Sequence, residues 1–434
     1  MFLVEGGRRL SGTVTPAGNK NAALPILAAT LLTDEPVTLR NLPRIGDVEV
    51  LLELLASVGV EIVELGPREV TVHARDVATT ALDPRLCRQI RASILLAAPM
   101  VSRCGRVQLP PPGGDSIGRR RVDTHFLALR ALGAEVTVDE TFDVRARALR
   151  AADIFLDEAS VTATENAIMG AVLAAGRTTI ANAASEPHVQ ELCHFLNGLG
   201  ARIAGVGTNA LAIDGVERLH GGDYTIGPDH IEVGSFIGLA AATGSELTIR
   251  DAAPEHLRMI ALVFERLGVR IAVRGNDVVV PGDQAPVVRD DLRGAIPKID
   301  DGPWPAFPAD LTSIAVVTAT QARGTVLIFE KMFESRFFFV DKLVQMGARI
   351  VLCDPHRVVV AGPSRLHGET LQSPDIRAGM ALLIAALAAR GTSEIHNVEQ
   401  IDRGYERLEE RLQALGANIQ RVHGRAYAGV GTPG

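Results

Sequence analysis

Aromatic residues are scarce in this sequence: they make up 4% of its 434 residues, and tryptophan occurs once. The core must therefore be built mainly from Leu, Val, Ile and Ala, and the 42 glycines indicate many tight turns. Basic residues are not in excess either, since the formal net charge is −7 and the isoelectric point is about 5.9. This balance argues against nucleic acid or an anionic membrane as the main partner, so any anion site has to be built locally.

Membrane and disulfide signals are also lacking. No apolar run approaches membrane-spanning length, and the N-terminus has neither the apolar segment nor the cleavage site of a signal peptide. The four cysteines (Cys87, Cys104, Cys193 and Cys353) show no CxxC or zinc spacing and lie in apolar surroundings. They predict buried structural thiols in a reducing compartment, and we expect a cytoplasmic protein.

What the sequence does contain is an internal repeat. The repeated unit is a stretch with helical apolar spacing, followed by a glycine and then by an apolar strand. It occurs six times, and Leu54–Ile62 is the first copy. The glycines of the six copies are Gly59, Gly133, Gly200, Gly268, Gly347 and Gly416. Glycine at this place fits the left-handed residue that ends a helix, and the alternation after it fits a strand.

Six α/β units of about 70 residues are too long for a solenoid and divide naturally into two domains of three units. The segment 224–230 resembles a crossing between the two halves. We place one domain at residues 20–229 and a second, discontinuous one at residues 1–19 plus 230–434. A cleft between such halves is a favoured place for a ligand, and its closure would exclude water.

The most unusual stretch is the loop at 109–123. Three prolines and two glycines precede Asp115, and Arg119, Arg120 and Arg121 follow it. An acid beside guanidinium groups suits a site that binds an anion and moves a proton near it. A solvated surface loop is the alternative interpretation.

Two basic residues stand at the start of apolar segments. Lys20 and Asn21 begin an Ala/Leu-rich helix, where a lysine opposes the helix dipole unless an anion also binds there. Arg91 precedes a long apolar segment and could equally be a snorkelling surface arginine.

Further along, Ser160–Asn166 is a hydroxyl-rich helix start, which could be a simple cap or could face a phosphate. Asp310 follows two prolines and two aromatics, so it is either an N-cap or a base with a tuned pKa. In the second half of the chain an acid is followed closely by an arginine three times, at Arg336, Arg377 and Arg403. Each pair could be a plain ion pair, or the three could line one site.

Taken together, these motifs resemble the enolpyruvyl transferase family from about Leu3 to Val422. They are more similar to the branch that uses UDP-N-acetylglucosamine than to the branch that uses shikimate 3-phosphate, which usually has a serine-rich Lys20 motif. The resemblance implies two inside-out α/β domains of three units each, with the active site in the cleft. It implies transfer of the enolpyruvyl group of phosphoenolpyruvate to the 3-hydroxyl of UDP-N-acetylglucosamine in peptidoglycan synthesis. This chemistry releases phosphate, passes through a tetrahedral intermediate and needs no metal or cofactor.

The resemblance also implies roles for single residues. Lys20, Arg120 and Arg403 would bind phosphoenolpyruvate, with Arg336 and Arg377 lining the same pocket. Asp310 would be the general base, and Asp375 a second acid near the reacting carbons. The acceptor would contact Asn21, Arg91, Arg121, Val122, Asp123, Thr124, Ser160, Val161, Thr162 and Asp310.

Asp115 takes the lid-loop position that in many members is a cysteine. This position is thought to deliver a proton to the phosphoenolpyruvate methylene, which a carboxylic acid can do only while protonated. Because fosfomycin alkylates the cysteine thiol, we predict that it does not inactivate this protein.

Departures from the family pattern concentrate on the acceptor side, at residues 121–124, at Thr162 and at His230. They leave three alternatives open: a divergent cell-wall enzyme, a transferase with another acceptor such as a uridine nucleotide, and a silent paralogue that binds nucleotide sugars. An architecture like RNA phosphate cyclase is disfavoured by the acidic charge. The oligomeric state stays open, and a monomer is compatible with the sequence.

Overall fold

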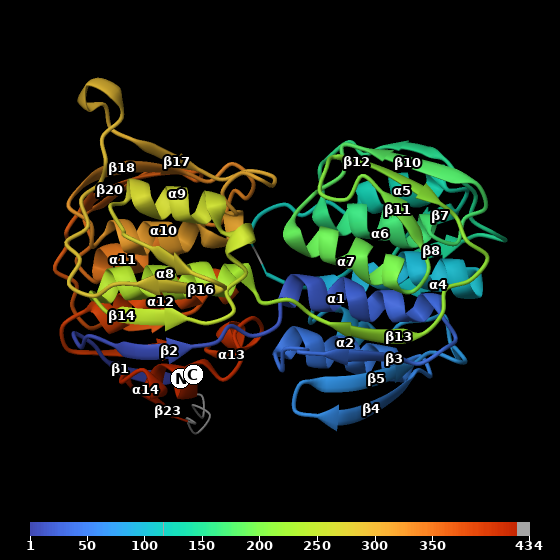
Figure 1. The fold of residues 1–434 in the computed structure, drawn as a ribbon, viewed down its shortest axis with the longest axis horizontal. Coiled ribbons are helices and arrows are strands. Elements are labelled where there is room, and N and C mark those ends of the chain that lie inside the picture. Colours follow the sequence, from blue (N-terminus) through green and yellow to red (C-terminus); the bar gives the residue numbers. More distant parts are fainter. Residues whose placement is uncertain (116, 423–434) are drawn as a thin grey trace, which may run out of the picture.

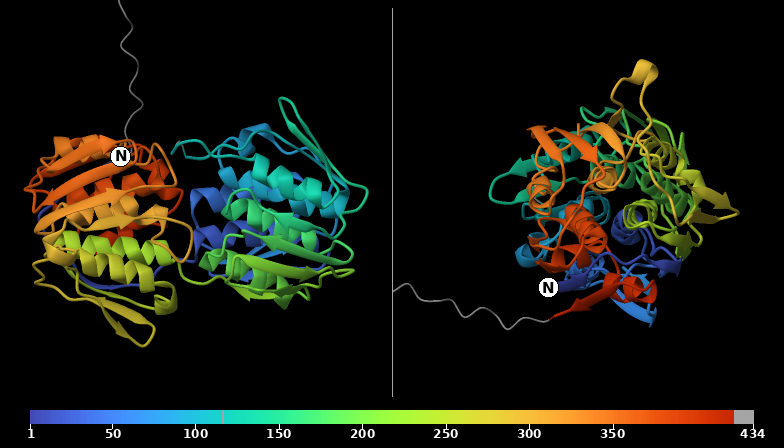
Figure 2. Two further views of the ribbon diagram at one scale, coloured as in Figure 1. Left: turned by 90° about the horizontal axis from the view of Figure 1, so that it is seen from above. Right: turned by 90° about the vertical axis from the view of Figure 1, so that its left-hand side faces the viewer.

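The computed structural model describes residues 1–115 and 117–422, which form two lobes side by side (Figures 1 and 2). The core of the first lobe draws its residues from between Ala22 and Ile226. The core of the second lobe draws on the chain before Val14 and on the chain from Ile231 to Ile419. The predicted domain boundaries at residues 20 and 229 fall between the residues of the two cores. The division into two domains at these positions stays a prediction.

The elements of the first lobe are α1 (Lys20–Ala29), η1 (Thr30–Leu32), β3 (Val37–Arg40), α2 (Gly46–Ser57), β4 (Glu61–Gly66), β5 (Glu69–His73), α3 (Pro84–Cys87), η2 (Arg91–Leu96), α4 (Ala97–Cys104), β6 (Arg106–Leu109), α5 (Asp123–Ala131), β7 (Glu135–Val138), β8 (Phe142–Arg145), β9 (Asp153–Phe155), α6 (Val161–Ala171), β10 (Arg177–Ala181), α7 (Pro187–Gly198), β11 (Arg202–Ala204), β12 (Ala210–Asp214) and β13 (Gly222–Thr225).

The elements of the second lobe are β1 (Phe2–Glu5), β2 (Ser11–Val14), α8 (His230–Thr243), β14 (Glu246–Ile249), η3 (Pro254–His256), α9 (Arg258–Arg266), β15 (Ala272–Arg274), β16 (Asp277–Val280), η4 (Leu292–Gly294), β17 (Lys298–Asp300), η5 (Ala309–Leu311), α10 (Thr312–Ala319), β18 (Gly324–Phe329), α11 (Val340–Gln345), β19 (Ile350–Asp354), β20 (Arg357–Gly362), β21 (Thr370–Gln372), α12 (Ile376–Ala388), β22 (Thr392–His396), α13 (Glu399–Asp402), α14 (Leu408–Ala414) and β23 (Asn418–Arg421).

The predicted six-fold repeat is confirmed by six small sheets in the described part of the chain. At each copy a helix ends at the repeat glycine, whose φ lies between 81° and 100°, and the next strand follows. The last sheet is completed by the start of the chain, because β23 pairs antiparallel with β1 in the register Phe2 opposite Arg421. The N-terminus and the end of the described chain therefore lie in the same lobe (Figure 1).

Helices fill the interior of each lobe and sheets cover the outside (Figures 1 and 2). In α8, α10 and α12 nearly every residue is buried, because these helices are apolar on all sides rather than amphipathic. Gly238 allows α8 to approach α10, since a Cβ there would lie 2.3 Å from Ile314 Cγ2. An alanine at Gly238 would overpack this contact at a cost of about 1–3 kcal/mol. The inside-out α/β arrangement implied by the resemblance is therefore confirmed.

Two chain segments cross between the lobes side by side. Gly18 and Pro228 form an antiparallel bridge, the Asn19 amide donates to the Gly227 carbonyl at 2.8 Å, and the Asp229 amide donates to the Ala17 carbonyl at 2.9 Å. Each segment runs directly into a buried helix, α1 or α8. The crossing thus fixes the starts of both helices at the boundary between the lobes.

The cysteine prediction is partly wrong. Cys87 and Cys193 are buried, Cys104 is half-buried, and Cys353 is exposed. Cys353 lies on β19, an edge strand of an outer sheet whose middle residues face solvent, so apolar neighbours in the sequence did not imply burial. Within the described residues, the longest apolar helices all fall short of what a membrane crossing needs.

Candidate active site

Six helical segments begin around one cavity of about 470 Å³ between the lobes. Three come from the first lobe (α1, η2 and α6) and three from the second (α8, η5 leading into α10, and α12). Residues at their starts that line the cavity are Lys20, Arg91, Val161, His230, Asp310 and Arg377. Helix N-termini present free amide N–H groups and the positive end of the helix dipole, so this arrangement favours anions.

Lys20 is part of a chain of ion pairs that joins the lobes. Its Nζ lies 2.9 Å from Asp47 Oδ2, and Arg403 donates from Nε to Asp47 Oδ1 at 2.8 Å. Arg403 Nη1 also donates to Asp115 Oδ1 at 2.5 Å, which attaches the lid-loop acid to the second lobe. Lys20 is therefore a buried site residue rather than an exposed surface lysine.

Asp47 is a member of this chain that sequence reasoning missed. Burial raises its pKa, but Lys20 and Arg403 outweigh burial and hold the pKa below its ordinary value. In the sequence it is one of two acids in the first turn of α2, where acids commonly favour the helix dipole, so nothing marked it as a site residue.

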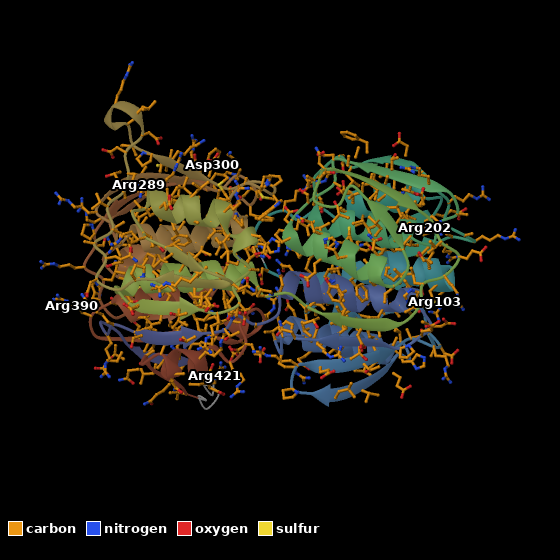
Figure 3. The ribbon with its side chains drawn as sticks, in the orientation of Figure 1. Arg103, Arg202, Arg289, Asp300, Arg390 and Arg421 are labelled. Atoms are coloured by element: carbon orange, nitrogen blue, oxygen red, sulfur yellow. The ribbon has the colours of Figure 1, made fainter. Side chains whose placement is uncertain are left out.

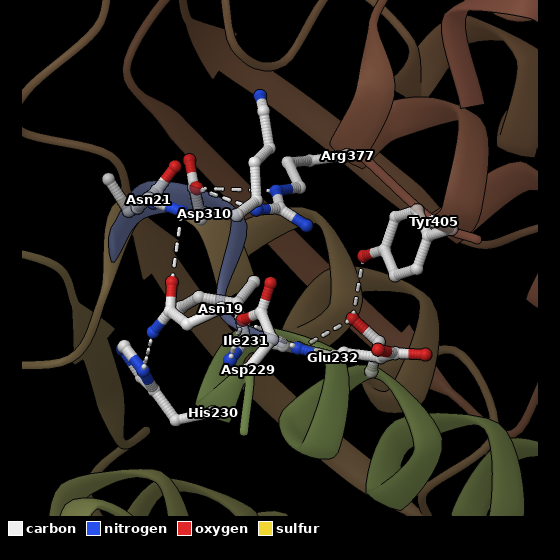
Figure 4. Close-up of polar contacts among 12 residues, drawn as sticks. Asn19, Asn21, Asp229, His230, Ile231, Glu232, Asp310, Arg377 and Tyr405 are labelled. Atoms are coloured by element: carbon white, nitrogen blue, oxygen red, sulfur yellow. Dashed lines mark hydrogen bonds and ion pairs between the residues drawn. The ribbon is translucent and has the colours of Figure 1, made fainter. Parts of the chain in front are cut away.

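Asp310 lies between two arginines, as the close-up shows for Arg377 (Figure 4). Arg336 Nη2 donates to its Oδ1 at 2.9 Å and Arg377 Nε donates to its Oδ2 at 3.2 Å. Burial raises the pKa of Asp310, but Arg377, Arg336 and Lys20 together hold it well below the ordinary value. Its side chain is 29% exposed, so a ligand in the cavity can reach the carboxylate.

The two arginines keep spare donors. Their side chains are only 2% and 3% exposed, and neither Arg336 Nε nor Arg377 Nη1 has a partner in the described part of the chain. They differ from the exposed Arg202, Arg289 and Arg390 on the outer faces of the lobes (Figure 3). Buried guanidinium groups with free N–H donors are suited to hold a carboxylate or a phosphate.

Asp375 is not among the residues that line the cavity. It is buried as the N-cap of α12 and accepts from the amides of Arg377 at 2.8 Å and Ala378 at 2.9 Å. Burial raises its pKa, Arg336 lowers it and the charge of Asp115 raises it, with a net rise. In this structure Asp375 fixes the start of the helix that carries Arg377.

The lid loop rests on the second lobe. The Arg119 amide donates to Glu334 Oε2 at 3.1 Å, and the Ser335 amide donates to the Ile117 carbonyl at 3.1 Å. Gly118 has a φ of 124°, a conformation that favours glycine, and a Cβ there would lie 2.2 Å from Glu334 Oε2. Arg120, which also lines the cavity, is largely buried, and burial lowers its pKa while the charge of Asp115 raises it.

On the acceptor side the structure brings together some predicted residues and not others. Asn21, Arg91, Arg121, Ser160, Val161 and Thr162 line the cavity; Val122, Asp123 and Thr124 are not among the lining residues. Asp123 pairs with Arg121, whereas Thr124 is buried and donates to Asp157 Oδ1 at 2.9 Å.

Two of the predicted acceptor residues, Arg91 and Thr162, are bonded within the protein. Arg91 Nη2 donates to the carbonyls of Arg120 at 3.1 Å and Arg121 at 2.7 Å. Its side chain therefore fixes the backbone of the loop at these two residues. Thr162 Oγ1 lies 3.1 Å from His125 Nε2. The hydroxyl of Thr162, one of the departures from the family pattern, is therefore used in a contact inside the first lobe.

Comparison with known proteins agrees with this geometry. A family model described as EPSP synthase (3-phosphoshikimate 1-carboxyvinyltransferase) matches residues 4–412, so the chain belongs to this family of enolpyruvyl transferases. It is 61% identical over 421 residues to UDP-N-acetylglucosamine 1-carboxyvinyltransferase of Bradyrhizobium diazoefficiens, covering 97% of this chain and 98% of the relative. It is 56% identical over 419 residues to the protein of the same name from Treponema denticola, covering 96% and 98%.

Solved structures are similar over the same range. The enolpyruvyl transferase NikO from Streptomyces tendae superposes with a TM-score of 0.85 at 27% identity, covering 96% of this chain and 98% of that chain. EPSP synthase from Acinetobacter baumannii superposes with a TM-score of 0.74 at 17% identity, covering 96% and 99%, which shows the shared fold alone.

Proposed function

We propose that this chain transfers the enolpyruvyl group of phosphoenolpyruvate to the 3-hydroxyl of UDP-N-acetylglucosamine and releases phosphate, as the first committed step of peptidoglycan synthesis. The observation that carries the proposal is the accessible Asp310 carboxylate among buried cations at converging helix N-termini. The named relatives at 61% and 56% identity over nearly the whole chain support this acceptor. A cytoplasmic location follows from this role as part of the proposal.

Phosphoenolpyruvate carries a carboxylate and a phosphate, so its site must supply several cations. We define the cationic end of the cavity as Lys20, Arg120, Arg336, Arg377 and Arg403. Arg336 and Arg377 offer their unpaired N–H donors to one anionic group. Lys20 and Arg403 are held together by Asp47, and we expect the second anionic group to be bound by these two residues with Arg120.

The chemistry then needs one base and one acid. Asp310 accepts the proton of the acceptor hydroxyl as its oxygen bonds to C2 of phosphoenolpyruvate. Asp115 donates a proton to C3, which requires that phosphoenolpyruvate displace it from Arg403 and that it enter the reaction protonated. The double bond is lost and a tetrahedral intermediate forms. Return of a proton from C3 and cleavage of the C2–O bond to phosphate then give the enolpyruvyl ether.

The arginines beside Asp310 make it a weak base in the empty site, because they stabilise its ionised form. Bound phosphoenolpyruvate brings negative charge to the same arginines. This charge raises the proton affinity of Asp310 when both substrates are present, which couples base strength to substrate binding.

The test is to incubate purified protein with phosphoenolpyruvate and UDP-N-acetylglucosamine and to identify the product by mass spectrometry. We expect the acceptor to gain one enolpyruvyl group per phosphate released. An unmodified acceptor under conditions in which the protein is folded would contradict the proposal.

A second candidate is transfer to another acceptor, such as a uridine nucleotide. The departures at Arg121 and Thr162 favour it, since both residues line the cavity on the acceptor side while the cationic end keeps the family residues. UMP in place of the nucleotide sugar in the same assay separates the two. Binding of UDP-N-acetylglucosamine without turnover would instead indicate a silent paralogue.

A further inference from the structure

Two buried acids lie behind the cationic end of the cavity and take no part in the chemistry above. Asp301 follows β17 on the loop that leads to Asp310, and Glu330 follows β18 on the segment that leads to Arg336. Asp301 is 1% exposed, Glu330 is fully buried, and neither is among the residues that line the cavity. Burial of a carboxylate is costly, so each of these groups needs a partner.

Glu330 joins its own segment to the start of α10. Its Oε1 accepts from the amides of Met332 at 3.3 Å and Phe333 at 3.2 Å, and its Oε2 lies 2.6 Å from Thr312 Oγ1. The Phe333 ring in turn packs against Arg336, whose guanidinium carbon lies 5.2 Å from the ring centroid. The Glu330 carboxyl group therefore fixes the backbone from which Arg336 is presented to the cavity.

Asp301 binds the same segment from the neighbouring loop. Its Oδ1 accepts from the Lys331 amide at 2.5 Å. On its own loop Asp301 forms a parallel bridge with Phe307, three residues before Asp310. Asp301 therefore joins the loop that carries the base to the segment that carries Arg336.

One oxygen of the two acids is left without a donor. Asp301 Oδ2 is buried and has no hydrogen-bond partner among the described residues. The side chains of Asp301 and Glu330 are in hydrogen-bonding contact, and two ionised carboxylates in contact repel each other. A proton on Glu330 removes this repulsion and supplies the missing donor. Burial and the contact with Asp301 raise the pKa of Glu330 to about 8 against the positive charge of Arg336, so Glu330 keeps its proton at neutral pH.

The other charged groups around the two acids do not replace this proton. They are Lys298 and Asp300 of β17, Asp310 of η5, Lys331, Glu334 and Arg336 of the Glu330 segment, and Asp354, His356 and Arg357 at the turn from β19 to β20. Asp300 pairs with both lysines, Asp354 pairs with Arg357, and Arg336 pairs with Asp310. His356 Nδ1 donates to the main-chain carbonyl of Glu330 at 2.7 Å, which it can do in the neutral and in the charged form.

Loss of the proton would change this arrangement in two ways. Two adjacent buried carboxylates repel each other, which loosens the contacts that they make with the segment at 330–336. The new negative charge on Glu330 also attracts Arg336 away from the cavity. Both changes weaken the hold of Arg336 on an anion.

We propose that Asp301 and Glu330 share one proton and act as positioning residues, so that the protonated pair presents Arg336 to phosphoenolpyruvate and the ionised pair withdraws it. This inference rests on the proposed function and deepens it by naming a proton-dependent control of substrate binding outside the cavity. Neither acid touches the reacting atoms.

The first measurement is the pH dependence of KM and kcat with phosphoenolpyruvate and UDP-N-acetylglucosamine. The wild type is compared with Glu330→Gln, which is nearly isosteric, keeps an acceptor for the Met332 and Phe333 amides, and cannot ionise. The matched control is Glu246→Gln, which changes an exposed glutamate of β14 in the same lobe. Circular dichroism establishes that each variant is folded.

We expect KM for phosphoenolpyruvate in the wild type to rise about tenfold between pH 7 and pH 9, because binding that requires a proton weakens about tenfold per pH unit above the pKa. In Glu330→Gln the same KM should stay within about twofold over this range, since no proton can be lost. The profile of kcat should be the same in both proteins. Glu246→Gln should follow the wild type in every value.

The second measurement needs no turnover. Trp304 is the single tryptophan of the chain and lies three residues after Asp301, so its fluorescence reports on this loop in the substrate-free protein. The wild type should show a transition with a midpoint at about pH 8, and Glu330→Gln should lack it. Glu186, which accepts from the Trp304 amide at 3.3 Å, is present in both proteins. A transition that persists in Glu330→Gln therefore arises elsewhere and overturns the inference.

An equal rise of KM in the wild type and in Glu330→Gln would also overturn the inference, with the proposed function intact. If Glu330→Gln does not fold, Asp301→Asn takes its place: its amide can donate to an ionised Glu330, so the alkaline rise of KM should again be absent. Failure of the wild type to release phosphate at any pH would instead overturn the proposed function. The fluorescence titration would still test the shared proton in that case.

Discussion

The two ends of the cavity solve the problem of burying polar groups in opposite ways. At the cationic end four of the five cations contact a carboxylate, through Asp47 between Lys20 and Arg403 and through Asp310 between Arg336 and Arg377. The opposite end, which we call the uncharged end, is lined by Glu165, Glu186, His188, His230 and Trp304. Burial there disfavours the charged forms, and Glu165, Glu186 and His188 each keep one buried polar atom without a partner in the described part of the chain. Isolated buried charges are too costly to keep, so a cation-rich site has to come with its own carboxylates.

The comparison teaches which groups a ligand must replace. An anion that enters the cationic end competes with Asp47, Asp115 and Asp310 for the same donors, so binding rearranges existing ion pairs. At the uncharged end the described residues form no ion pair that a ligand would have to replace. Changes at the cationic end should therefore affect catalysis strongly.

The largest expected effect comes from removing the base between the arginines. Asp310→Asn keeps the shape of the side chain but cannot accept the hydroxyl proton, so kcat should fall about 10²- to 10⁴-fold. Binding of UDP-N-acetylglucosamine, measured by calorimetry, should stay within a few-fold of the wild type. A near-normal kcat would remove Asp310 as the base.

The next largest effect concerns the lid-loop acid. Asp115→Asn cannot donate a proton to C3, and we expect kcat to fall about 10²-fold. Asp115→Cys is the informative partner, because it places a thiol where fosfomycin reacts. It should show time-dependent inactivation by fosfomycin in an assay of phosphate release, whereas the wild type should show none. Covalent, time-dependent loss of wild-type activity would contradict this account.

A moderate effect is expected at Lys20. Lys20→Met keeps the apolar stem but leaves Asp47 paired with Arg403 alone, and one charge-assisted bond to phosphoenolpyruvate is lost. Such a bond contributes about 1.5–3 kcal/mol, so KM for phosphoenolpyruvate should rise about 10- to 100-fold. The KM for the acceptor should change far less. Equal increases in both values would mean that Lys20 supports the whole site rather than its cationic end.

A smaller effect is expected from the contact that holds the lid loop. Glu334→Ala removes the acceptor of the Arg119 amide at the exposed rim of the loop, and we expect kcat/KM to fall about threefold, a net loss typical of one hydrogen bond. Limited proteolysis should cut the loop faster in this variant than in the wild type. Unchanged cleavage would show that the contact does not hold the loop.

The last effect concerns the pH dependence of stability rather than catalysis, and it arises at Glu330, close to Arg336. Burial raises the pKa of Glu330 to about 8 from an ordinary value near 4.5, and the neighbouring Asp301 contributes to the rise. The folded state therefore keeps a proton that the unfolded state loses, so the free energy of unfolding should fall as pH rises from about 4.5 to 8. Glu330→Gln has no such proton. Its melting temperature relative to the wild type should rise between pH 5 and pH 8, and a constant difference would contradict the assignment.

The sequence predicted the architecture and the cationic end because both rest on distinctive local patterns. Six glycines at helix ends defined the repeats, and lysine or arginine beside an acid is conspicuous in an acidic chain. The positions of Val122, Asp123 and Thr124 depended on how the loop turns into α5. Arg91 and Asp157 set that turn, and neither contact is visible in the sequence.

The uncharged end could not be predicted from the sequence, because its properties come from burial in the folded structure. Glu165 and Glu186 read as ordinary helix-start acids, and His188 as an ordinary helical polar residue. These side chains become buried only when α6 and α7 pack against each other and against α1. In this packing one polar atom of each side chain has no hydrogen-bond partner among the described residues. Burial of this kind is a tertiary property, and so is the ion pair of Asp47 with Lys20.

The most direct test of the account is the rate of phosphate release from phosphoenolpyruvate with UDP-N-acetylglucosamine, UMP and shikimate 3-phosphate as acceptors. We predict release with the nucleotide sugar alone, because its 3-hydroxyl is the group that Asp310 deprotonates in the proposed reaction. Release with UMP or shikimate 3-phosphate, or with none of the three, would contradict the account and place the change of function in the altered acceptor segments.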